Sequence, residues 1–172
     1  MLIRKIASFK RWDLNEIPNL ITREKPLFTG DAISDLRTSG NTISVWETPD
    51  LTQANVAPIL ATLALNGDKL NKVVYVALDE NYLKEKEILV NPVMGQCNSV
   101  VDQSILQRHR DISEVDYWHL GYLAEYIFDL VKNNKYYSAT FSEIKTYVKD
   151  LIQSNKVDPV KMNASIRKQL GY

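Results

Sequence analysis

Hydrophobic and polar positions alternate with a period of two over several short stretches of the first half of the chain, which predicts β-strands. Residues 2–9 alternate well enough for an N-terminal strand, and T-I-S-V-W-E at 42–47 is rich in β-branched and aromatic residues. V-V-Y-V-A-L at 73–78 is almost continuously apolar, as expected for a strand covered on both faces. The stretch I-L-V-N-P-V at 88–93 gives a fourth strand.

Between the second and third of these strands the apolar spacing becomes helical. One buried stripe, which ends before Asn66-Gly67, holds Val56, Ile59, Leu60 and Leu63. Two strands that flank a helix of this length form a βαβ unit, so we expect 42–47 and 73–78 to pair in parallel through a right-handed crossover.

Capping and turn residues predict the remaining elements of this half. Pro18 and Pro26 indicate a loop over 13–30, and a short helix is expected over 32–38. Asp79 is placed to cap a short charged helix that ends near Lys86.

The second half of the chain has mainly helical patterns. We expect helices over 101–108, 114–132, 141–154 and 159–169. T-F-S-E at 140–143 fits a capping box, and Asp158-Pro159 is an N-cap followed by proline at the first helical position. The sequence therefore predicts one mixed α/β domain over 1–172. A small sheet of three or four strands with a βαβ unit, within about 1–95, is packed by a helical part over about 101–172.

Composition narrows the class of protein without naming a function. Hydrophobic residues make up 45% of the 172 positions and charged residues 24%, which are ordinary globular values. Cys97 is the only cysteine, so an internal disulfide and a cysteine-based structural zinc site are excluded. No apolar stretch has the length of a signal-peptide core or a membrane span. We expect a cytoplasmic protein in a reduced state, without a bound metal or cofactor.

Charge is unevenly distributed although the formal net charge is zero. Residues 29–131 carry seven Lys/Arg against fifteen Asp/Glu, whereas 132–172 carry eight against three. Such asymmetry indicates which faces of a protein meet which partners.

Both histidines lie in Q-R-H-R-D-I-S-E-V-D-Y-W-H-L at 107–120. His109-Arg110-Asp111 matches part of the protein-kinase catalytic loop, but the chain has no glycine-rich phosphate loop and is too short for a kinase. The segment is better interpreted as a helix start, with Asp111 or Ser113 as N-cap. The alternative is a small hydrolase or nuclease that uses His109, His119 and Asp111.

The helix that follows is acidic and aromatic. From Asp111 to Val131 there are five carboxylates and no Lys or Arg. Its apolar stripe is expected to hold Val115, Trp118, Tyr122, Leu123, Tyr126, Ile127, Leu130 and Val131. Aromatic residues beside a charged patch are enriched at protein interfaces, where acids steer a basic partner and rings anchor it. The expected partner-binding residues are Glu114, Asp116, Tyr117, Tyr122, Glu125, Tyr126 and Asp129.

The function that these patterns favour is non-enzymatic. We expect an interaction protein, such as an immunity-type or antitoxin-type inhibitor, that masks a basic partner, for example a nuclease toxin. No G-x-S-x-G, Walker or dinucleotide-binding segment is present. A third hypothesis is nucleic-acid binding by the basic C-terminal helix pair through Lys161, Arg167 and Lys168, as in a helix-turn-helix. No membrane partner is expected. Asp79-Glu80 follows a buried strand and could hold Mg²⁺, but capping explains it better.

Overall fold

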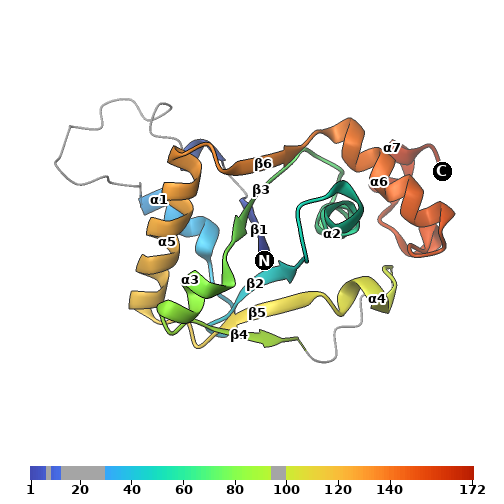
Figure 1. Cartoon of the computed structure of the whole chain (residues 1–172). Coiled ribbons are helices and arrows are strands. Elements are labelled where there is room, and N and C mark those ends of the chain that lie inside the picture. The colour runs from blue at the N-terminus through green and yellow to red at the C-terminus, as the bar shows by residue number, and fades with distance from the viewer. Residues whose placement is uncertain (7–8, 13–29, 94–99) are drawn as a thin grey trace.

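The computed structural model describes residues 1–6, 9–12, 30–93 and 100–172 (Figure 1). The strands are β1 (Leu2–Ile6), β2 (Ile43–Glu47), β3 (Val73–Leu78), β4 (Leu89–Pro92), β5 (His109–Ser113) and β6 (Tyr136–Ala139). The helices are α1 (Gly30–Ile33), α2 (Gln53–Leu65), α3 (Glu80–Glu85), α4 (Gln103–Leu106), α5 (Tyr117–Lys132), α6 (Phe141–Gln153) and α7 (Ala164–Leu170). Most of the predicted loop over 13–30, and Cys97, lie outside the described residues.

The six strands form one sheet in the order β4-β5-β2-β1-β3-β6, and every neighbouring pair is antiparallel. The prediction of three or four strands was too low. The predicted parallel pairing of 42–47 with 73–78 is also wrong, because β1 lies between β2 and β3 and runs against both. Strand β1 suits this central place since it presents apolar side chains to both faces, with Leu2 and Ile6 on one and Ile3 on the other.

Helices cover both faces of the sheet and give the molecule three layers. Figure 1 shows α1, α3 and α5 on one side of the strands and α2, α6 and α7 on the other. The α5-side core includes Val76, Leu78, Ile112, Leu123 and Ile127. The α2-side core includes Trp46, Ile59, Tyr75, Ile144 and Ile166.

The half predicted as helical contains two strands. His109–Ser113 is strand β5, which pairs with β2 and β4, and Tyr136–Ala139 is the edge strand β6. The predicted helix over 101–108 is reduced to α4, and the one over 114–132 begins at Tyr117. The predicted helix over 159–169 is a 3₁₀ turn at Pro159–Lys161 followed by the short α7. Both strands are short, and H-R-D-I-S of β5 has a single apolar residue, Ile112.

The capping predictions at Asp79, Thr140 and Asp158 are confirmed. Asp79 accepts a hydrogen bond from the Asn81 amide and begins α3. Thr140 and Glu143 form the predicted reciprocal capping box of α6. Asp158 accepts from the Val160 amide. These local signals depend on a few neighbouring residues, which explains why sequence alone located them.

Candidate functional site

The turn between β5 and α5 determines where the helix begins. Glu114 has a φ of 55°, in the left-handed region, and turns the chain out of the strand. Val115 then packs into the α5-side core while its amide donates to the Asn41 carbonyl at 3.0 Å. Asp116 follows as the N-cap, in place of the predicted Asp111 or Ser113.

A capping box closes the first turn of α5 and gives one of the two histidines a structural role. Asp116 Oδ1 accepts from the His119 amide at 2.8 Å, and the Asp116 amide donates to His119 Nδ1 at 3.4 Å. Two amides that have no partner within the helix are thereby satisfied. His119 is half-buried at the start of the helix, where it acts as a cap.

Two large aromatic side chains project from this first turn into solvent. Tyr117 is 82% exposed and Trp118 is 70% exposed, and their rings meet edge to face at 6.0 Å. The prediction that Trp118 belongs to the buried stripe is wrong. The helix buries Leu123, Ala124, Ile127, Phe128 and Val131 instead, and Trp118 lies off that stripe. Neighbouring aromatic side chains with this much exposure are typical of binding surfaces.

An apolar groove of about 330 Å³ lies beside the two rings. Its lining residues are Ile33, Tyr117, Trp118, Leu120, Gly121, Tyr122 and Glu125. A side chain at Gly121 would meet no atom within 4 Å, so the absence of a Cβ there keeps this part of the groove open. Among the described residues that line the groove, Glu125 is the only charged one.

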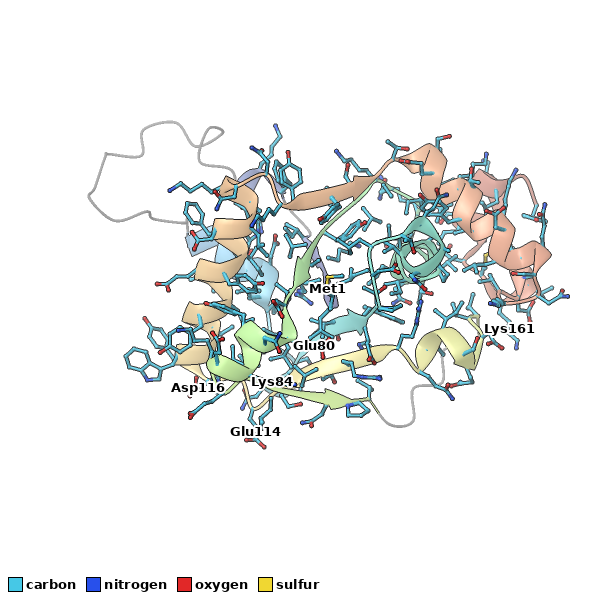
Figure 2. All side chains as sticks on the ribbon, viewed as in Figure 1. Met1, Glu80, Lys84, Glu114, Asp116 and Lys161 are labelled. Atoms are coloured by element: carbon cyan, nitrogen blue, oxygen red, sulfur yellow. The ribbon has the colours of Figure 1, made fainter. Side chains whose placement is uncertain are left out.

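Four exposed carboxylates lie in α5 or just before it, and all four are among the partner-binding residues expected from the sequence. They are Glu114, Asp116, Glu125 and Asp129. Figure 2 shows Glu114 and Asp116 at the end of α5 next to α3, pointing away from the body of the molecule. Asp116 lies 3.2 Å from His119 Nδ1, whereas the other three form no ion pair with any described residue. We call Glu114, Asp116, Tyr117, Trp118, Gly121, Glu125 and Asp129 the α5 surface.

The two other tyrosines predicted as anchors make contacts within the protein. The Tyr126 hydroxyl accepts from the Asp79 amide at 3.0 Å, and its ring stacks on Tyr82 at 3.9 Å. Tyr122 is half-buried and lies 4.9 Å from the Lys86 ammonium, in cation–π range. Both rings therefore hold α3 against α5, and Tyr122 also forms one wall of the groove.

The residues of the hydrolase alternative do not come together. His109 lies on the α2 side of the sheet, where it contacts the Trp46 ring at 5.0 Å, whereas His119 is on α5 on the opposite face. His109 is only 4% exposed, and its Nε2 is 3.7 Å from Asp111 Oδ1, beyond hydrogen-bond range. Burial lowers the pKa of His109, and Arg110 adds to this while Asp111 opposes it. The geometry provides a buried neutral imidazole, not a paired acid and base at a solvent-accessible site.

Within the described ranges, no three His, Cys, Asp or Glu side chains are grouped closely enough to hold a metal ion. Asp79 is used as a cap, as noted above, and Glu80 lies in the first turn of α3. Across the same part of the chain, no helix combines the length and apolar character that crossing a bilayer requires.

The basic C-terminal helices differ from a helix-turn-helix. Ten residues separate α6 from α7, and α7 has only seven. Lys161 forms an ion pair with Asp158 at 3.4 Å, and Lys168 is exposed whereas Arg167 is half-buried. Figure 2 shows Lys161 at the opposite end of the molecule from Asp116, so the acids of the α5 surface are not neutralised by this basic end.

Comparison of the chain with protein-family models, with curated proteins and with solved structures gave no match. The interpretation of the site therefore depends on its geometry and chemistry. The structure shows the four acids and Tyr117 exposed, and their role in partner binding stays a prediction. The sequence pattern had placed Trp118 in the buried stripe and had not indicated Gly121. A signal was present, because Y-W at 117–118 directly follows an N-cap, where side chains often lie outside the apolar stripe.

Proposed function

We propose that this protein is a binding module whose α5 surface captures and masks a basic protein partner. The observation that carries the proposal is the adjacent pair Tyr117 and Trp118, both largely exposed on a helix that also presents acids. Three of those acids, Glu114, Glu125 and Asp129, form no ion pair with any described residue. An inhibitor of the immunity or antitoxin type, which covers a basic nuclease, is the most specific form of this function.

The two rings would supply most of the binding energy. Tryptophan and tyrosine are enriched among interface hot spots, where truncation to alanine costs about 2 kcal/mol or more. Each such loss corresponds to roughly a thirtyfold rise in Kd. A rigid helix also presents the rings at little cost in conformational entropy, since its first turn is already fixed by the capping box.

The four acids would set the partner's charge and the rate of encounter. Carboxylates around an apolar centre attract a basic surface over a distance of about one Debye length, roughly 8 Å at physiological salt. Rim charges mainly change the association rate, so we expect binding to weaken as salt rises.

The test is a quantitative pull-down with the immobilised full chain from a lysate of the cells that make it. We expect a stoichiometric basic protein, identified by mass spectrometry, that elutes as salt rises. The Tyr117→Ala/Trp118→Ala variant should lose it. Phe141→Ala is the matched control, because Phe141 is an exposed ring on α6 at a distance from the α5 surface. Capture that survives the double variant, or no capture at all, would overturn the proposal.

A charge variant tests the steering role of the four acids. Glu114, Glu125 and Asp129 are changed to their amides, and Asp116→Asn is added because asparagine is as good an N-cap as aspartate. We expect a slower association rate and a flatter salt dependence, with an unchanged melting temperature. Asp150→Asn on α6 serves as the charge control, since Asp150 is exposed outside the α5 surface.

A further inference from the structure

A second cavity, of about 210 Å³, lies where α2 ends and the chain turns into β3. It is lined by Lys5, Ala64, Gly67, Asp68, Lys69, Asn71, Lys72 and Val73. We call it the lysine pocket. It belongs to the α2 side of the sheet, whereas α5 covers the opposite face (Figure 1). It is therefore separate from the α5 surface.

The loop that forms this pocket is fixed to α7. The Leu70 amide donates to Gln169 Oε1 at 2.7 Å, and the Ser165 hydroxyl donates to the Asp68 carbonyl. Leu70 itself is buried in the α2-side core. With the backbone held at these points, Lys69 and Lys72 leave the chain from defined positions on either side of a buried residue. The backbone of the pocket loop is thus preorganised, and the exposed lysine side chains extend from it.

Three lysines and one aspartate are among the residues that line this small space. Lys5, Lys69 and Lys72 form no ion pair with any residue in the described parts of the chain. Partial desolvation lowers the pKa of Lys5, and the neighbouring Arg4 guanidinium lowers it further. Asp68 is exposed and also forms no described ion pair. The lining therefore has an excess of positive charge.

We propose that the lysine pocket binds a small phosphorylated molecule through Lys5, Lys69 and Lys72. Lysine binds phosphate oxygens as a point charge with three donors, and several such donors around one cavity suit a ligand with more than one negative charge. The Asn71 amide offers a further donor, and Ala64 and Val73 provide an apolar wall for the organic part of a phosphate ester. The volume suits one or two phosphate groups.

Isothermal titration of the full chain with inorganic pyrophosphate at low ionic strength tests this proposal. We expect saturable binding at one site. Lys5→Gln, Lys69→Gln and Lys72→Gln should each raise Kd by about three- to tenfold, because charge-assisted hydrogen bonds are the strong ones. Lys84→Gln is the matched control: Lys84 is an exposed lysine on α3, labelled in Figure 2, and its replacement should leave Kd unchanged.

Asp68→Asn gives a test that misfolding cannot imitate. Removing the one carboxylate of the pocket should lower Kd by about two- to fivefold, since it removes repulsion of the anion at close range. No saturable binding, equal losses in Lys84→Gln and the pocket variants, or an unchanged or higher Kd in Asp68→Asn would each overturn the proposal. These results would not bear on the α5 surface, which pyrophosphate does not probe.

Discussion

Gly121→Ala should make the protein more stable while changing the groove beside Tyr117 and Trp118. Gly121 is the fifth residue of α5 and is exposed. Its φ is not positive, and an added Cβ would meet no atom within 4 Å, so alanine fits without strain. Alanine in a helix interior is favoured over glycine by about 0.5–1 kcal/mol. Because the added methyl group clashes with no atom, we expect the free energy of unfolding to rise by nearly that amount.

For a chain of this length, 1 kcal/mol corresponds to a rise in Tm of roughly 2–4 °C. Thermal unfolding followed by far-ultraviolet circular dichroism would measure this rise in Tm. Gly40→Ala is the matched control, for which we expect the opposite change in Tm. Gly40 and Asn41 both have positive φ, 61° and 58°, in the turn before β2, so alanine there should lower Tm by a similar amount.

The stability gain should come with a loss of function, because the new methyl group would occupy the open part of the groove. Partner capture by Gly121→Ala should therefore weaken although the folded protein is more stable. A Tm equal to or below that of the wild type would refute the claim that a Cβ at Gly121 points into open space. A raised Tm with unchanged capture would show that the partner does not use the groove.

Three further predictions concern the rest of the molecule. Trp118→Phe should remove most of the fluorescence that acrylamide quenches, because Trp12 and Trp46 are buried; equal quenching before and after the change would contradict the exposure of Trp118. Burial lowers the folded-state pKa of His109 below 6.5, so as pH falls through 6.5 the unfolded chain takes up the proton first and stability declines. His109→Phe should reduce that decline in urea titrations, and an unchanged pH dependence would assign the acid sensitivity to other groups. Thr140→Ala should cost about 1 kcal/mol of unfolding free energy by removing the cap of α6, whereas Thr146→Ala on the exposed side of the same helix should cost less.

The fold was predictable from the sequence where a few neighbouring residues determine the outcome. The buried stripe of α2, the apolar run of β3 and the caps Asp79, Thr140 and Asp158 depend on local spacing and local hydrogen bonds. The order of strands was not predictable, because it depends on which distant strand β1 pairs with. Strand β5 was missed for a related reason. H-R-D-I-S has little apolar character, and only pairing with β2 and β4 on both sides makes it a strand.

The candidate site was half predictable. The predicted helix over 114–132 has four carboxylates and no Lys or Arg before Lys132, so it must present acids to solvent. The exposure of Glu114, Asp116, Glu125 and Asp129 was therefore predictable. Which aromatic residues share that surface depends on where the helix begins. Moving its start from 114 to 117 leaves Trp118 in the first turn, outside the buried stripe. The lysine pocket had no sequence signal, since Lys5 is brought to Lys69 and Lys72 only by the pairing of β1 with β3.

The central position of β1 has a consequence for how the molecule unfolds. In the described sheet, β1 alone joins β4-β5-β2 to β3-β6 by hydrogen bonds. Separating either part from β1 would expose unpaired backbone amides and carbonyls on a strand edge that is otherwise internal. We therefore expect the two parts to open together, with the β1 amides exchanging their hydrogens slowest of all. A fragment that lacks Leu2–Ile6 would have two open inner edges, each able to pair with another chain, and we expect it to aggregate.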